Sequence, residues 1–131
     1  METLLLEAVA TEKDLGHSTA ANELREAIRD MSRRPEPDVT GAIQHAIASL
    51  ECVAREVSGS TETFGKWLAN HRDAFPKPLG EYVGKIWGFA SERGRHLVEN
   101  GEPSVEEAEL VLGLSATLGS YLTKKGNGNP I

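Results

Sequence analysis

The chain has 131 residues, of which 39% are hydrophobic and 26% are charged, a composition typical of one soluble globular domain. Its formal net charge of −6 argues against a protein that coats nucleic acid through bulk electrostatic attraction, because such binding needs many Lys and Arg side chains. The single cysteine, Cys52, excludes an internal disulfide and a cysteine-based zinc site, and it favours a cytoplasmic protein with an inert thiol. The apolar run Leu4–Leu6 is short and lacks a basic flank, so we expect neither a targeting segment nor a membrane span.

Residues 1–37 are expected to form a helical segment followed by a proline-rich connector. Apolar side chains recur at three- and four-residue steps from Leu24 to Met31, which predicts one face of a helix. The prolines within Arg33–Pro37 end that helix, because proline cannot donate a backbone hydrogen bond. Gly16 favours a break between this helix and a separate short one near the amino end.

The stretch from Asp38 to Ser58 is predicted to be one long helix. Its apolar residues again recur at three- and four-residue steps. Asp38 or Thr40 can accept hydrogen bonds from the first amides, and Gly59 can adopt the left-handed conformation that ends a helix.

Two further helices are predicted in the middle of the chain. Phe64, Trp67 and Leu68 indicate a short bridging helix, which ends before the turn at Pro76–Pro78. Pro78 suits the first turn of the next helix. The apolar face of that helix is marked by Leu79, Val83, Ile86, Trp87 and Ala90.

The last long helix is predicted to begin at a capping box, in which Ser104 and Glu107 satisfy each other's backbone amides. It ends near Lys124–Gly126, where cations suit the carbonyl end of the helix. Residues 38–125 therefore form the helical core, and residues 126–131 are a flexible tail.

The apolar residues of this last helix extend beyond one stripe, so the helix needs two neighbours. Its inward face is predicted to comprise Ala108, Leu112, Ser115 and Leu122. Either the helix is the central one of a monomer, or a second subunit covers a partly exposed seam. Because no alternation typical of strands appears, the predicted fold class is all-α, an up-and-down bundle of four to five helices.

The stretch Ser91–His96, with the sequence SERGRH, concentrates charge and an imidazole directly after a predicted helix. We expect it to form the connection between that helix and the last one. A connection of this composition is often simply solvated, since its charges avoid the core.

Three stretches of the chain resemble the HEPN domains, in particular the branch found in bacterial abortive-infection and related defence proteins. They are residues 41–55 (GAIQHAIASLECVAR), residues 85–96 (KIWGFASERGRH) and residues 102–111 (EPSVEEAELV). The likeness spans most of Thr40 to Leu122, and the run from Trp87 to His96 is its most specific part.

The resemblance implies a homodimer, often with metal-independent ribonuclease activity in a prokaryotic toxin or antiphage defence system. It assigns catalysis to Arg95, His96 and Arg93, with Ser91 and Glu92 supporting the phosphate and the imidazole, and it implies no cofactor. RNA cleavage without metal needs a base for the 2′-hydroxyl proton, an acid for the leaving oxygen and positive charge for the phosphorane. Two copies of His96 across a symmetric interface can divide the acid and base roles, while the arginines hold phosphate oxygens.

The chain departs from the family's catalytic pattern at one point, because Arg95 is adjacent to His96 instead of several residues before it. Some HEPN domains are not catalytic. The alternative is therefore a non-catalytic HEPN-like dimerisation or interaction module of a larger defence protein, whose partners are other domains of that polypeptide or an antitoxin. Nucleotide binding gains little support, since no glycine-rich phosphate loop of recognised spacing is present.

The basic residues of the middle of the chain allow a local basic patch within the acidic whole. They are Arg72, Lys77, Lys85, Arg93 and Arg95. Arg55 is a supporting candidate: it either packs its stem and pairs with an acid, or points toward the dimer site.

The remaining histidines and the tryptophans are assigned structural roles. His45 lies off the apolar face of its helix and is a polar helix position rather than a ligand. His17 and His71 have no companion at metal-binding spacing, so we expect no metal site. Trp67 and Trp87 are at helical core positions, which favours packing over base stacking.

Overall fold

A computed structural model describes residues 2–14, 18–95 and 102–126. The helices, in chain order, are α1 (Glu2–Asp14), α2 (Ser18–Met31), α3 (Val39–Ser58), α4 (Phe64–Asn70), the 3₁₀-helix η1 (Arg72–Ala74), α5 (Leu79–Arg95) and α7 (Val105–Gly126). The predicted all-α class is confirmed. The described part of the chain holds six α-helices, more than the four or five expected, because the amino-terminal segment forms two, α1 and α2.

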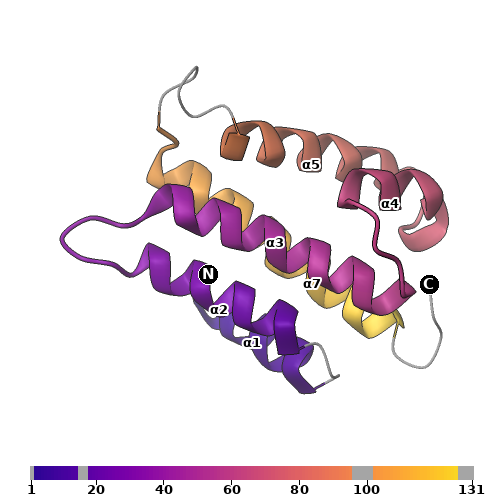
Figure 1. Ribbon diagram of the computed structural model, residues 1–131, viewed down its shortest axis with the longest axis horizontal. Coiled ribbons are helices and arrows are strands. Elements are labelled where there is room, and N and C mark those ends of the chain that lie inside the picture. The colour runs from indigo at the N-terminus through magenta and orange to yellow at the C-terminus, as the bar shows by residue number, and fades with distance from the viewer. Residues whose placement is uncertain (1, 15–17, 96–101, 127–131) are drawn as a thin grey trace.

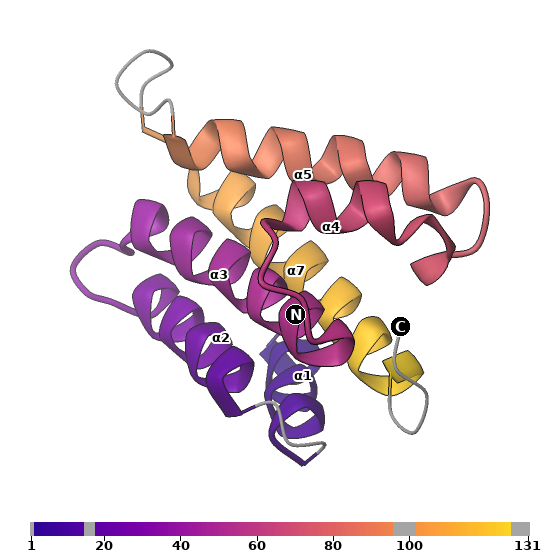
Figure 2. The ribbon, with the colours of Figure 1, turned by 45° about the vertical axis from the view of Figure 1, so that its right-hand side comes forward.

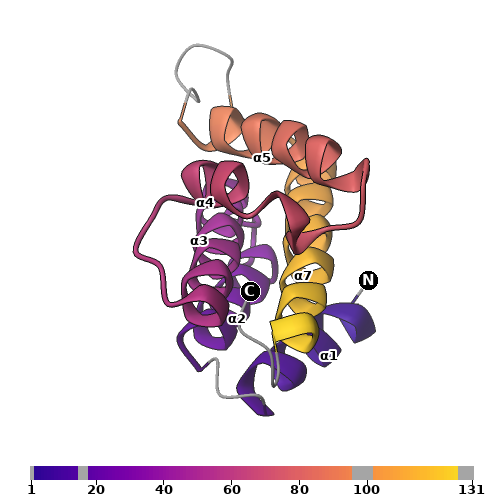
Figure 3. The same ribbon diagram turned by 90° about the vertical axis from the view of Figure 1, so that its right-hand side faces the viewer.

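The helices are stacked in three layers, with α3 and α7 in the middle (Figures 1 and 3). α1 and α2 cover one side of the middle layer, and α4 and α5 cover the other. α2 and α5 run opposite to α3 and α7. The carboxyl ends of α2 and α5 therefore lie at the same end of the molecule as the amino ends of α3 and α7 (Figure 2).

The core consists of two apolar clusters on either side of the middle layer. The first joins α1, α2, α3 and α7 through residues such as Leu5, Leu24, Ile43 and Leu112. The second includes buried side chains of α3, α4, α5 and α7 and contains the fully buried Trp67. Since α3 and α7 contribute to both clusters, the amino-terminal segment and the carboxyl-terminal helices share one continuous scaffold.

The predicted helix ends are confirmed in detail. Asp38 Oδ1 accepts a hydrogen bond from Gly41 N at 2.9 Å, so Asp38 caps α3. Gly59 ends α3 with a left-handed φ of 72°, which glycine adopts without a steric penalty. At the start of α7, Glu107 N donates to Ser104 Oγ (3.0 Å) and Ser104 N donates to Glu107 Oε1 (3.2 Å), which is the predicted capping box.

The predicted inward face of α7 is also confirmed. Its four residues, Ala108, Leu112, Ser115 and Leu122, are all buried. On the opposite side, Leu110 is 51% exposed and Tyr121 is 37% exposed. A second subunit covering this seam stays a prediction. No helix in the described ranges combines the length and the apolar character that crossing a membrane requires.

Candidate functional site

The predicted catalytic stretch lies at the carboxyl end of α5. The backbone from Ser91 to Arg95 is helical, so the expectation that this stretch forms a connection is wrong for these five residues. The apolar pattern stops at Ala90, but serine, glutamate and arginine continue a helix readily without any apolar partner. His96 lies outside the described residues, as do the side chains of Ser91, Glu92, Arg93 and Arg95.

This end of the molecule also carries the connection between α2 and α3, with two more arginines (Figure 1). Arg33 has 58% of its side chain exposed, and its Nε lies 3.4 Å from Asp30 Oδ1. Arg34 is exposed and donates from its guanidinium to the backbone oxygens of Ser32 (3.1 Å) and Arg33 (2.9 Å). We call this end, defined by residues 33–34 and 93–95, the arginine end.

The arginine end is not uniformly basic, because α7 begins there with exposed acids. Glu106 is exposed in the first turn of α7, and Glu102 is exposed just before it. Guanidinium groups bind phosphate oxygens through a planar pair of N–H donors. An anionic ligand at this end would therefore be held by local contacts with the arginines and not by a general field, in line with the acidic net charge.

Arg55 lies at the carboxyl end of α3, at the opposite end of that helix from the arginine end. Since α3 has 20 residues, it is about 30 Å long. Arg55 Nε donates to the backbone oxygen of Glu62 at 3.2 Å, and its guanidinium lies 3.7 Å from Glu51. Within one chain, Arg55 therefore holds the connection from α3 to α4 and is not brought together with Arg93 or Arg95.

A buried carboxylate that sequence reasoning missed lies between α2 and α3. Asp30 is 1% exposed, and its Oδ2 lies 2.6 Å from Nδ1 of His45. An ionised carboxylate only accepts hydrogen bonds, so Nδ1 of His45 is the donor. Asp30 also accepts Asp38 N through its backbone oxygen at 2.8 Å. The pair fixes the end of α2 against α3.

The signal for this pair was present in the sequence as an acid in an apolar pattern. Asp30 follows Leu24 and Ala27 at helical spacing, and a buried acid requires a partner. The partner could not be read from spacing, because His45 is fifteen residues away on another helix. Its Nδ1–H is oriented as in a catalytic histidine. No hydrogen bond between described side chains joins its Nε2 to a nucleophile, so we assign this pair a structural role.

A second feature not predicted is an open groove between α4, η1 and α5, with a volume of about 900 Å³. We call it the α4–α5 groove. Its walls include His71, Arg72 and Lys77 on one side and Gly84 and Trp87 on the other.

The α4–η1 wall of the groove is held by contacts to the core. The ring of His71 stacks on Trp67 with centroids 4.6 Å apart. Lys125 Nζ donates to the backbone oxygens of Asp73 and Ala74 at 2.9 and 2.8 Å, which ties η1 to the end of α7. The groove is therefore a fixed feature of the packing.

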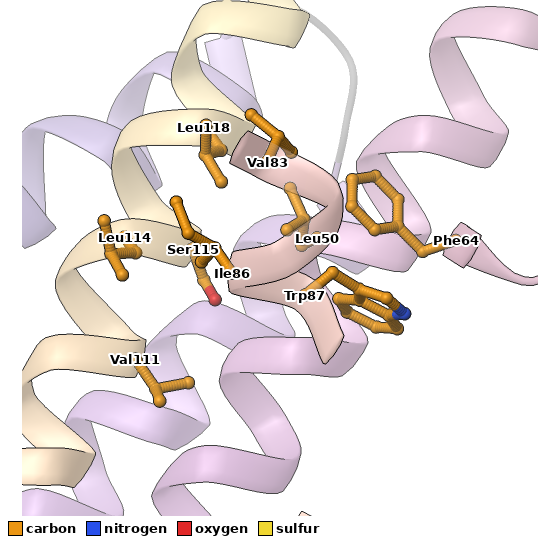
Figure 4. A pocket seen from close by; sticks show the side chains of 9 residues that line it. All are labelled: Leu50, Phe64, Val83, Ile86, Trp87, Val111, Leu114, Ser115 and Leu118. Carbon is orange, nitrogen blue, oxygen red and sulfur yellow. The ribbon is translucent and has the colours of Figure 1, made fainter. Parts of the chain in front are cut away.

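A small apolar pocket lies beneath α5, between α5, α3 and α7. It is lined by residues such as Leu50, Ile86 and Leu114, with Ser115 as a polar group (Figure 4). It reflects the loose seating of α5 on the middle layer. Trp87 borders both spaces, and its indole nitrogen points away from this pocket (Figure 4).

No group of three or more potential ligand residues within the described ranges is arranged to hold a metal ion. Cys52 is a free, half-buried cysteine on α3. Burial raises the pKa of the Cys52 thiol, and the nearby carboxylates of Glu23 and Glu56 raise it further. A thiol with a raised pKa is a poor nucleophile at neutral pH.

Comparisons with protein families, with curated proteins and with solved structures found no match to this chain.

Proposed function

We propose that this chain is a HEPN-like domain that cleaves RNA without a metal ion and acts as a homodimer, in a prokaryotic toxin or antiphage defence setting. The proposal rests on the resemblance of residues 41–55, 85–96 and 102–111 to that family. An all-helical bundle is the architecture that this resemblance implies. In the proposal, Arg93, Arg95 and His96 carry out the reaction.

The observation that carries the proposal is the place of the sequence motif at the arginine end. Residues 93–95 close α5 at the end of the bundle where Arg33 and Arg34 also lie. Charge at the end of a bundle is accessible to a long polyanion, whereas a site between helices would not be. An RNA strand that crosses this end meets arginines from two separate connections, which supports phosphate binding there.

The proposed chemistry needs two histidines, because one imidazole cannot donate and accept a proton in the same step. One copy of His96 removes the 2′-hydroxyl proton, and the other protonates the leaving 5′-oxygen. Arg95 and Arg93 stabilise the charge that develops on the phosphorane oxygens. Ser91 and Glu92 support these groups by binding the phosphate and orienting the imidazole.

A second copy of the chain is supported by exposed apolar side chains on α5 and α7. Most of the exposed large apolar side chains among the described residues are on these two helices: Leu79, Tyr82, Val105, Leu110 and Tyr121. Apolar surface of this kind is typical of a protein interface. Arg55 supports the reaction only if the second copy brings its α3 to the arginine end of the first.

The second candidate function is a non-catalytic interaction module of a larger defence protein. The same exposed apolar residues favour it, because they suit another domain or an antitoxin as well as a second copy. The two candidates differ in whether His96 has a chemical role.

The test is an RNA cleavage assay in the presence of a metal chelator, combined with sedimentation analysis of the same samples. We expect His96→Ala to reduce cleavage by about 10²–10⁴-fold, the typical contribution of general acid–base catalysis, while the dimer persists. His17→Ala, a histidine to which the proposal gives no role, is the matched control. Unchanged cleavage in His96→Ala, or a monomer at every concentration, would overturn the proposal.

A further inference from the structure

The α4–α5 groove contains hydrogen-bonding groups that no described residue uses. Trp67 Nε1 donates to Ser58 Oγ at 2.7 Å. By contrast, Trp87 Nε1 faces Gly65 across the groove, 3.7 Å from where a Cβ on that glycine would be, and no hydrogen bond between described residues satisfies it. A half-buried indole N–H without a partner is a donor available to a ligand.

His71 supplies an acceptor on the other side of the groove. Its Nδ1 lies 2.9 Å from the backbone oxygen of Trp67. A carbonyl oxygen only accepts, so Nδ1 carries a proton, and in the neutral imidazole Nε2 is left as an acceptor. The stack on Trp67 fixes the plane of this ring. The groove therefore has both a donor and an acceptor held by the core.

Four charged residues line the same groove: Arg72, Asp73, Lys77 and Glu81. Within the described ranges, no ion pair joins any of these side chains. Two cations suit the oxygens of a phosphate, and two carboxylates accept hydrogen bonds from sugar hydroxyls, as an acidic residue does in dinucleotide sites. A ligand with one anionic group and several hydroxyl groups uses all four charges.

The groove also offers flat walls on which a planar ring can lie. Gly65 on α4 and Gly84 on α5 face it without side chains. A Cβ added at Gly84 would meet nothing within 4 Å, so no neighbour in the described structure requires a glycine there. Glycine inside a helix costs about 1 kcal/mol relative to alanine. Close approach of a ligand to the backbone would account for it.

We propose that the α4–α5 groove binds a nucleotide unit, with the base between the glycine walls beside Trp87 and the phosphate at Arg72 and Lys77. The base accepts a hydrogen bond from Trp87 Nε1 and donates one to His71 Nε2. The ribose hydroxyls donate to Asp73 and Glu81.

The nucleotide unit has two possible sources, a free mononucleotide and one residue of a single-stranded RNA. Gly84 and Arg95 are eleven residues apart on α5, about 16 Å along the helix. A strand lying along α5 would join the groove to the arginine end and make the groove a specificity subsite. The RNA source rests on the proposed function, whereas the mononucleotide source does not.

The test uses the two indole N–H signals of the full chain in ¹H–¹⁵N NMR spectra, assigned with Trp87→Phe. We expect nucleoside 5′-monophosphates, or a single-stranded RNA with 2′-O-methyl groups that prevent cleavage, to shift the Trp87 indole signal. The Trp67 signal is the internal reference, because its donor is already bonded to Ser58. Inorganic phosphate alone should bind at least tenfold more weakly than a mononucleotide, since it lacks the base.

Matched glycine variants test the location of the binding site. Gly84→Leu fills the groove, and we expect it to weaken nucleotide binding at least tenfold. Gly88→Leu is the control, because Gly88 is outside the groove lining and has equal room for a side chain; it should bind within twofold of the original chain. Thermal melts of both variants confirm that they fold.

Each outcome decides the inference. Binding of mononucleotides without RNA identifies a free nucleotide as the ligand, and tighter binding of RNA identifies the strand. An unmoved Trp87 signal with every probe overturns the inference, and so does an equal loss of binding in Gly84→Leu and Gly88→Leu. His96→Ala should leave the Trp87 shift intact, so failure of the ribonuclease proposal and failure of the groove are distinguishable.

Discussion

The two sides of the middle layer are packed very differently. α3 buries nine of its 20 residues between its neighbours, among them Ile43, Leu50 and Val53. On the other side, Val83 is the one buried residue in the stretch 79–88 of α5, while Leu79 and Tyr82 are 44% and 56% exposed. The helices α1, α2, α3 and α7 thus form a rigid scaffold, and α5 is a loosely held layer upon it.

This difference indicates where function can be placed on the molecule. Segments with few buried apolar contacts open at lower free energy than the core, and binding surfaces are drawn from such segments. Both the predicted catalytic stretch and the α4–α5 groove include α5. The scaffold side, in contrast, uses its polar residues for structure, as in the pair of Asp30 and His45.

Hydrogen exchange should show the largest contrast between the two sides. We expect the backbone amides of residues 82–88 in α5 to exchange at least tenfold faster than those of residues 43–54 in α3, because local opening of α5 exposes little apolar surface. The measurement is native-state hydrogen exchange followed by mass spectrometry. Equal protection in the two helices would show that α5 opens only when the whole domain unfolds.

The scaffold side can be weakened most directly at His45. In His45→Ala, the carboxylate of Asp30 stays buried with Arg33 as its remaining cation, 3.4 Å away. Losing one partner of a fully buried pair costs about 3–5 kcal/mol. We expect about 2 kcal/mol here, because 39% of the His45 side chain is exposed and water reaches that side of the pair. Urea unfolding at pH 7 measures the change.

A double variant controls for other effects of this substitution. Asp30→Ala combined with His45→Ala removes the buried charge together with its partner. It should cost less than the sum of the two single changes, since the single His45→Ala includes the penalty for the unpaired carboxylate. Additive effects would mean that the 2.6 Å contact between these residues contributes no coupling energy.

The helix ends could be predicted from the sequence because their chemistry is local. Asp38, Gly59 and the pair Ser104 and Glu107 act within one turn of their own helix, so spacing alone identified them. The extent of α5 was predicted less well, since apolar periodicity reports where a helix is packed and not where its backbone continues. The turn from Ser91 to Arg95 is helical without that pattern.

The groove and the buried pair could not be predicted, because both arise from the way separate helices pack. Asp30 meets His45 only once α2 folds back on α3. Likewise, Trp87 faces Gly65 only after the turn between η1 and α5 places the two helices together. Sequence spacing correctly assigned Trp67 to the core, but it could not show that the indole nitrogen of Trp87 would face an open groove.

Glycine-to-alanine substitutions should have opposite signs on the two sides of the molecule. At Gly41, a Cβ would lie 2.5 Å from Asp38 Oδ2 and 2.8 Å from Asp30 Oδ2, and both carboxylates are held by hydrogen bonds. We expect Gly41→Ala to destabilise the protein by about 1–3 kcal/mol, as overpacking does. Gly84→Ala meets no neighbour and should stabilise it by about 1 kcal/mol through helix propensity.

Thermal and urea unfolding of the two variants give the comparison. If Gly41→Ala is neutral, the caps around Asp38 and Asp30 are more adaptable than their contacts indicate. If Gly84→Ala is destabilising, α5 is packed against a neighbour at that position, and the account of α5 as a loose layer is wrong.

The smallest expected effect concerns the thiol of Cys52, which reports on the α2–α3 side of the scaffold. Burial raises the pKa of this thiol, and the charges of Glu23 and Glu56 raise it further. Alkylation by iodoacetamide requires the thiolate, so the rate in the folded protein should rise at higher pH than the rate in urea. Glu23→Gln removes one negative charge, lowers the pKa and should speed alkylation slightly at a given pH. Coinciding pH profiles in the folded and the unfolded chain would mean that α2 leaves Cys52 open to water, and the tight packing of this side would then not extend to the carboxyl half of α3.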